Sequence, residues 1–225
     1  WLSGPWGVMS YCAALGRTLE HVEAGTLDEL VAGNAHQRSG GQTVVRVYPD
    51  TGYDQILSSG FAVDVWMEPG VTPDILASSM ATFYQEEAPE GGVALVLGAG
   101  NIASIPPLDV ISKLYAEGSV CLLKMNPVNS YLGPLFEEIF AEFVEAGYMR
   151  FAYGDVDVGV YLTRHERVDE IHLTGSAATH DAIVYGTGPE GAARKERDEP
   201  EIEVPVTSEL GGVSPIVVLP GDWGE

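Results

Sequence analysis

Apolar residues in the second half of the chain recur in short runs that alternate with amphipathic stretches. The runs predict four strands, over Val93–Leu97, Val120–Lys124, Arg150–Tyr153 and Glu170–Leu173. A predicted helix follows each strand, over residues 106–117, 132–146, 156–163 and 177–185. Short apolar strands alternating with helices are typical of a parallel sheet with helices on both faces. The predicted fold class is therefore α/β, with a doubly wound, Rossmann-like parallel sheet flanked by helices.

The first part of the chain has a different pattern. Apolar residues within 5–33 recur at steps of four and three, which predicts a helix and a second short helical stretch at 27–31. Thr43–Tyr48 and Phe61–Trp66 predict strands, and residues 73–84 predict a return to helix. We therefore expect an N-terminal helical and strand-containing region over residues 1–90 and a βα domain over residues 91–225.

Residues 186–203 interrupt the alternation. They begin with Gly186 and Pro189 and continue as a run of mixed charge, which predicts a solvated loop. The apolar positions of Ile202–Val206 then predict another strand.

The charge balance restricts the classes of partner. Eleven Lys and Arg stand against 33 Asp and Glu, for a net charge of −22. Such a surface repels phosphate backbones and anionic membranes, so we expect neither nucleic acid nor membrane as a partner. An anionic cofactor would have to be held by local devices such as a helix N-terminus or one well-placed lysine.

The chain has two cysteines, Cys12 and Cys121, which are far apart and lie in apolar surroundings. They predict neither a disulfide framework nor a metal site, and the expected location is the cytoplasm. No apolar run reaches membrane-spanning length and no signal peptide is recognisable. Both ends of the chain resemble cuts inside a longer polypeptide.

Candidate chemistry lies in the loops that follow the predicted strands, because parallel sheets bind ligands beyond the carboxyl ends of their strands. The turn at residues 98–101 lacks the third glycine of a dinucleotide fingerprint, since position 103 is Ala. Asn101 is a possible hydrogen-bond donor at the mouth of the sheet, or a residue that caps the next helix. Lys124 suits a ribose hydroxyl or a phosphate, or else extends from the strand end into solvent.

Two further segments carry polar groups at such positions. Thr174, Gly175 and Ser176 close a strand and open a helix, whose free amides can hold a pyrophosphate, although Ser176 fits a simple helix cap equally well. Glu209 lies among glycines and apolar residues. Desolvation there would raise its pKa toward that of a general base, whereas the alternative is a surface glutamate before a turn.

The order of these elements over roughly residues 90–220 resembles the aldehyde dehydrogenase superfamily. The most specific parts are Leu173-Thr-Gly-Ser176 and Glu209-Leu-Gly-Gly212. The resemblance implies oxidation of an aldehyde, or reduction of an acyl group, through a thioester on a cysteine, with NAD or NADP as coenzyme. It also implies a small-molecule aldehyde or acyl substrate and a homo-oligomer for the full-length enzyme.

Site roles follow from the same resemblance. Asn101 would be the side-chain donor of an oxyanion hole, and Glu209 would activate water for thioester hydrolysis. Lys124 would contact the adenosine ribose, and Ser176 with Gly175 the pyrophosphate. The implied coenzyme-binding set is completed by Thr174, Gly154 and Leu210.

The chain departs from the family pattern at three places. Pro127 stands where an acidic residue usually grips the ribose diol, so the choice between NAD and NADP is open. His180 lies in a stretch that replaces a glycine usual in the family. It is either a titrating group near the cofactor or a residue on the surface of the helix. The nucleophilic cysteine is missing: Cys121 is expected to be buried and inert, and Cys12 to pack in the core. This chain alone is therefore predicted to be inactive.

Two other functions stay open. An acyl-CoA reductase of the same family is one, although Glu209 favours hydrolysis to a free acid. A nucleotide-binding module that never had a nucleophile is the other. Unpaired sheet edges and exposed apolar faces also predict self-association or low stability of the isolated piece.

Overall fold

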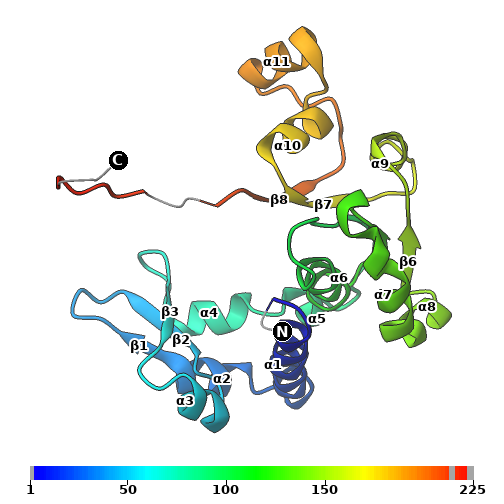
Figure 1. Cartoon of the computed structure of the whole chain (residues 1–225). Helices are drawn as coiled ribbons and strands as arrows, with labels where there is room; N and C mark the ends of the chain where they lie inside the picture. The colour runs from blue at the N-terminus through cyan, green and yellow to red at the C-terminus, as the bar shows by residue number, and fades with distance from the viewer. Residues whose placement is uncertain (1–2, 213–215, 222–225) are drawn as a thin grey trace. The chain divides into compact units, whose positions relative to one another are not determined.

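The structure, a computed structural model, describes residues 3–212 and 216–221. The chain forms two compact units, one of residues 1–91 with 102–120 and one of residues 92–101 with 121–225 (Figure 1). The domain boundary expected near residue 90 stays a prediction, since compactness alone does not define a domain. None of the helices in the described part is both long and apolar enough to cross a membrane.

The first unit combines helices with a small antiparallel sheet. Its strands pair in the order β1-β2-β3, and the predicted strand over Thr43–Tyr48 is confirmed as β2. The predicted helix over residues 73–84 is divided, because Ala81 adopts a left-handed conformation at φ 50°. Cys12 is exposed on its helix, so its expected core packing is wrong. The elements are α1 (Pro5–Ala24), α2 (Leu27–Asn34), β1 (Ala35–Gln37), β2 (Thr43–Tyr48), α3 (Gly52–Leu57), β3 (Val63–Trp66), α4 (Pro73–Ser79), α5 (Thr82–Gln85) and α6 (Ile105–Ala116).

The second unit contains the parallel sheet that the alternating pattern predicted. Its strands are β4 (Val93–Leu97), β5 (Val120–Lys124), β6 (Met149–Ala152), β7 (Glu170–Gly175) and β8 (Val206–Leu210), in the spatial order β6-β5-β4-β7-β8. The chain moves outward from β4 to β6 and then returns to the other side of β4, so the strand order reverses between β4 and β7. The α/β, doubly wound fold class is confirmed.

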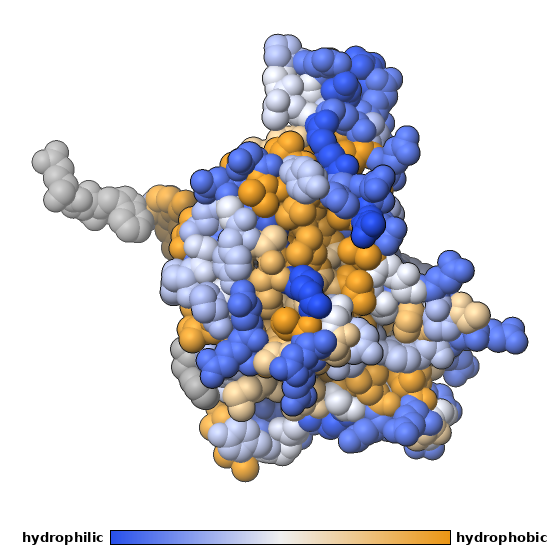
Figure 2. All heavy atoms as spheres, turned by 90° about the vertical axis from the view of Figure 1, so that its right-hand side faces the viewer, coloured by the Kyte–Doolittle hydropathy of each residue, from blue (hydrophilic) through white to orange (hydrophobic). Residues whose placement is uncertain are grey.

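Helices connect most of these strands. They are the 3-10 helix η1 (Pro127–Leu132) and α7 (Gly133–Ile139), α8 (Ala141–Ala146), α9 (Val156–Thr163), α10 (Ala177–Val184) and α11 (Gly188–Arg197). Figure 2 turns the side of Figure 1 that carries β6 and α9 toward the viewer, and apolar atoms are open to solvent across it. Val156 and Val160 of α9 are among the exposed apolar side chains of the unit.

The buried core of this unit explains one wrong prediction. Leu95, Val168 and Ile171 are buried, and Ile202 and Val204 pack against them. This alternating burial gives residues 202–206 the hydrophobic pattern of a strand. Pairing with β7 begins only at Val206, so β8 lies four residues later than predicted.

The solvated loop predicted over residues 186–203 is also wrong, because α11 occupies most of it. Its residues include strong helix formers such as Ala192 and Ala193. Glu190 and Arg194 form an ion pair one helical turn apart at 2.8 Å, and the last turn carries three basic residues that favour a helix C-terminus. The run of mixed charge in this segment therefore forms a helix on the surface and not a loop.

Candidate functional site

The carboxyl ends of β4, β5, β7 and β8 lie side by side at the reversal of the strand order. Leu97 pairs with Leu173, and Thr174 pairs with Glu209. The Gly98 N–H donates to the carbonyl oxygen of Lys124 over 3.1 Å, which joins the loop after β4 to the end of β5. In open parallel sheets this point is where ligands bind.

A cavity of about 500 Å³, called here the first pocket, opens at this point. Its walls come from the ends of β4, β5 and β7 and from α9 and α10. Lys124, Thr174, Gly175 and Ser176 all line it, so the structure brings four of the predicted coenzyme-binding residues together. Val156 and Val160 add an apolar wall from α9.

Lys124 is the most unusual group of the first pocket. Only 7% of the residue is exposed, and its ammonium has no hydrogen bond or ion pair among the described residues. Burial lowers the pKa of Lys124, and the charges of Asp155 and Asp157 oppose that shift. A buried cation without a hydrogen-bond partner among the described residues is costly, and an anion or a polar oxygen beside it would reduce that cost.

A second pocket, of about 690 Å³, shares Asn126, Thr174, Gly175 and Ser176 with the first. It is also lined by Asn101 and Glu209, the two residues with predicted catalytic roles. Asn101 is exposed in the loop after β4, and Glu209 is exposed in β8. The burial that was expected to desolvate Glu209 is not found in the structure, so its role as a base stays a prediction.

The start of α10 follows the expected geometry. Ser176 is the N-cap, and its hydroxyl oxygen accepts a hydrogen bond from the Thr179 N–H over 3.1 Å. Capping satisfies one of the amides at the helix start that have no partner within the helix, and it leaves the others without one there. The cap is therefore confirmed, and binding of a pyrophosphate there stays a prediction.

Two predicted residues lie outside both linings. Gly154 has φ 126°, and a Cβ atom there would lie 2.5 Å from Cγ2 of Val158, so this position needs glycine for backbone reasons. Leu210 is the register partner of Gly175. Coenzyme contacts by Gly154 and Leu210 stay predictions.

The structure also describes the surroundings of Cys121 and His180. Cys121 is 3% exposed within β5, which confirms its burial. His180 is half-buried on α10, and its Nδ1 lies 3.2 Å from the carboxylate of Asp181. Hydrogen bonds from Lys195 and then from His180 hold the pKa of Asp181 below its usual value.

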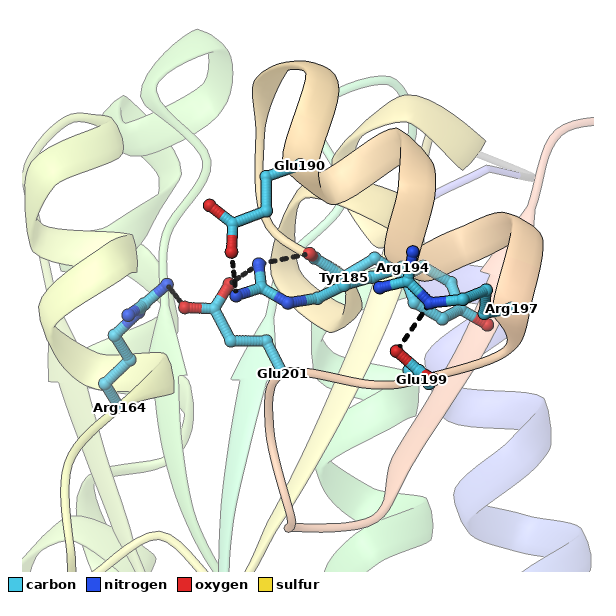
Figure 3. A network of polar contacts seen from close by, with 7 residues as sticks. All are labelled: Arg164, Tyr185, Glu190, Arg194, Arg197, Glu199 and Glu201. Atoms are coloured by element: carbon cyan, nitrogen blue, oxygen red, sulfur yellow. Dashed lines mark hydrogen bonds and ion pairs between the residues drawn. The ribbon is translucent and has the colours of Figure 1, made fainter.

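Sequence patterns missed two residues of the first pocket, Asn126 and Arg164. Asn126 stands two positions after Lys124, so the rule that ligands bind at strand ends could have found it. Arg164 follows α9, and no local motif marks it. Its guanidinium donates to Glu201 over 3.0 Å, and Glu201 also contacts Arg194 at 3.5 Å (Figure 3).

The chain is similar to known proteins over most of this unit. The family model described as "Aldehyde dehydrogenase family" matches residues 69–222, which are 154 of the 225 residues. Coniferyl aldehyde dehydrogenase of Pseudomonas sp. (strain HR199) is 25% identical over 153 residues, covering 68% of this chain and 28% of that protein. The chain spans less than a third of the length of the curated relatives it matches.

Solved structures of similar proteins cover about half of the chain. An aldehyde dehydrogenase from Bartonella henselae is 27% identical, with a TM-score of 0.40, over 54% of this chain and 23% of that chain. A NADP-dependent glyceraldehyde-3-phosphate dehydrogenase from Bacillus halodurans C-125, solved in complex with NADP, is 23% identical, with a TM-score of 0.41, over 54% of this chain and 23% of that chain.

Proposed function

The chain belongs to the aldehyde dehydrogenase family, and from this premise we propose that its parallel sheet is the coenzyme-binding part of an NAD(P)-dependent aldehyde dehydrogenase. The observation that carries the proposal is the buried Lys124, whose ammonium has no hydrogen bond or ion pair within residues 3–212 and 216–221 and which lines a pocket at the reversal of the strand order. In a chain of net charge −22, a buried lysine inside such a pocket is a local device for an anionic ligand.

The residues present suit a dinucleotide. Lys124 would bind a ribose hydroxyl or phosphate of the adenosine half, and Val156 and Val160 offer the apolar wall that a flat base requires. Gly175, Ser176 and the first amides of α10 would hold the pyrophosphate, because a helix N-terminus favours negative charge. Thr174 lines both pockets beside them. The coenzyme, when bound, supplies the acceptor or donor of the hydride.

The second pocket would hold the reacting group. Asn101 would donate its side-chain N–H to the oxygen on which negative charge develops in the tetrahedral intermediate. Glu209, which lines the same pocket, would take a proton from the water that attacks the thioester. Glu209 is exposed to solvent in this structure, so water can reach its carboxylate.

Neither cysteine of this chain is a good candidate for the nucleophile of the proposed reaction. Cys121 is 3% exposed within β5, and Cys12 is exposed on α1 of the other unit. A thiol buried among apolar atoms is unreactive. We therefore propose that this chain binds coenzyme without turning over an aldehyde or acyl substrate. A homo-oligomeric, cytoplasmic full-length enzyme is part of the same proposal.

An acyl-CoA reductase of the same family is the alternative reaction. Transfer to coenzyme A needs no activated water, so it would leave Glu209 without a role. The presence of Glu209 and Asn101 in the lining of one pocket favours hydrolysis of the thioester to a free acid.

The test is calorimetric titration of the chain with NAD and NADP, repeated on Lys124→Ala and Ser176→Gly. Glycine is tolerated at an N-cap at a cost of only a few tenths of a kcal/mol, so Ser176→Gly removes the hydroxyl with little effect on α10. No carboxylate is among the described residues that line the first pocket, and Lys124 lines it with its charge unpaired, so we expect NADP to bind at least as tightly as NAD.

The matched control is Lys195→Ala, which removes a surface lysine that contacts Asp181 at 2.6 Å. We expect saturable binding that weakens about tenfold or more in Lys124→Ala and changes little in Lys195→Ala, since hydrogen bonds to charged groups contribute roughly 1.5–3 kcal/mol. A folded chain that binds neither dinucleotide would contradict the proposal.

A further inference from the structure

Among the described residues, Asn126 is the only one with a side-chain amide that lines both pockets. It lines the first pocket together with Lys124, and it lines the second pocket together with Asn101 and Glu209. Any elongated ligand that extends from one pocket into the other must therefore pass Asn126 and the Thr174–Ser176 segment, which lines both.

The orientation of the Asn126 side chain is determined by its neighbours. Its Oδ1 accepts a hydrogen bond from the Val128 N–H over 3.0 Å, which identifies that end of the amide as the oxygen. The Nδ2 group has no hydrogen bond among the described residues. Asn126 is thus the N-cap of η1, and its two N–H bonds stay available as donors.

Contact with the loop after β4 restrains this side chain further. A Cβ atom on Gly100 would lie 2.7 Å from Oδ1, 2.8 Å from Cγ and 3.0 Å from Nδ2 of Asn126, so the amide lies directly against the glycine backbone. Asn129 ties the same two loops together. It is 5% exposed and donates its Nδ2–H to the carbonyl oxygen of Ala99 over 2.8 Å.

The side-chain amide of Asn126 is neutral, and its orientation is restrained by its neighbours. It offers two N–H donors without a positive charge, so it would bind an oxygen acceptor of a ligand. The Thr174–Ser176 segment lines the same two pockets, and the start of α10 that follows it offers backbone N–H groups and the positive end of the helix dipole. Donors from two separate elements fit a group with several acceptor oxygens, and the central pyrophosphate of a dinucleotide is such a group.

We propose that Asn126 Nδ2 is a binding residue for that pyrophosphate, holding the coenzyme where it passes from the first pocket to the second. The inference rests on the proposed coenzyme-binding function. It adds a side-chain donor from η1 to the contacts expected from α10, and it makes the Asn126 amide a determinant of dinucleotide affinity but not of adenosine affinity.

The test compares two ligands that share adenosine and differ in phosphate. NAD affinity is measured by calorimetry, and adenosine affinity by chemical-shift titration, for the unsubstituted chain, Asn126→Asp and Asn126→Ser. Aspartate and serine both keep an oxygen that can accept from Val128, so η1 keeps its cap. Aspartate adds a negative charge where the amide donors were, and serine removes the Nδ2 donors.

We expect Asn126→Asp to weaken NAD binding more than tenfold and Asn126→Ser to weaken it several-fold, with adenosine affinity unchanged in both. Tyr131→Asp is the control for added charge, because Tyr131 is 73% exposed on η1 and lies outside both pocket linings. It should leave NAD affinity within about twofold.

The other outcomes separate the two claims. NAD affinity unaffected by either Asn126 substitution would overturn the role of Asn126 while leaving the coenzyme site in place. Equal weakening of NAD and adenosine would also overturn it, since the residue would then act on the adenosine side or on folding. If the unsubstituted chain binds adenosine and NAD equally weakly, no pyrophosphate subsite exists, and binding of neither ligand overturns the proposed function itself.

Discussion

At the scale of single residues, Lys124 couples coenzyme binding to pH. Burial lowers the pKa of its ammonium in the free chain, so part of the population loses this proton as pH rises toward the ordinary lysine value of about 10.4. An anionic ligand beside Lys124 favours the charged form and raises the pKa again. Binding therefore takes up protons in the window above the lowered pKa, and affinity falls as pH rises through it.

The measurement is calorimetric titration of NAD at increasing pH in two buffers with different ionisation enthalpies. We expect the difference between buffers to reveal proton uptake, and Lys124→Met to abolish both the uptake and the fall in affinity. Lys195→Met, which removes a surface lysine, should keep both. Persistence of the uptake in Lys124→Met would assign the titration to another group.

Strand-end rules predicted part of the site and could not predict the rest. Lys124 and Ser176 were predicted because one ends an apolar strand and the other lies in the turn after one, and parallel strands bring such positions to one edge. Arg164 reaches the first pocket from the end of α9, which depends on how α9 packs and not on any local pattern. The exposure of Glu209 likewise depends on what covers β8, which the residues around it do not reveal.

At the scale of elements, Glu201 connects α11 with the end of α9. Its carboxylate accepts from Arg164 at 3.0 Å and lies 3.5 Å from Arg194 (Figure 3). Its backbone N–H donates to the Val184 carbonyl oxygen. The Arg197–Glu199 pair of the same segment is more exposed and joins only neighbouring residues. The first group links elements and the second does not, so their removal should have different effects.

Glu201→Ala should speed amide hydrogen exchange throughout α11, since Arg194 and Arg164 then lose their shared partner. The global effect should be small, because partly exposed ion pairs contribute only about 0–1 kcal/mol each. Glu199→Ala is the matched control and should leave exchange in α11 unchanged. Equal exchange in the two variants would mean that helix propensity alone holds α11 in place.

The strands β4 and β5 were predicted to the residue, whereas α11 and β8 were not, for a physical reason. Buried strands of a parallel sheet have to be apolar along their whole length, so β4 and β5 have clear limits in the sequence. The segment over residues 202–206 packs against the core with the alternation of a strand but lacks most of the hydrogen bonds of one. Side-chain burial and backbone pairing are separate properties, and a hydrophobic pattern reports only the first.

At the scale of the whole molecule, strong surface charge opposes apolar association. In the described part, β8 pairs with β7 alone and so forms an edge of the sheet. The apolar run Ile216–Leu219 that follows is 67–90% exposed. An open edge followed by exposed apolar residues favours pairing with a second copy. A net charge of −22 on each copy opposes that pairing, and salt screens the repulsion.

We therefore expect self-association that increases with ionic strength, measured by sedimentation velocity from about 0.01 to 0.5 M salt, where the Debye length falls from about 30 Å to below 10 Å. Val217→Lys interrupts the apolar run and should shift the chain toward the monomer at every salt concentration. Val47→Lys, an exposed apolar position on β2, is the control and should behave as the unsubstituted chain. A monomer at all salt concentrations would show that the edge of β8 and the residues after it are not sufficient to join two copies, whatever the charge.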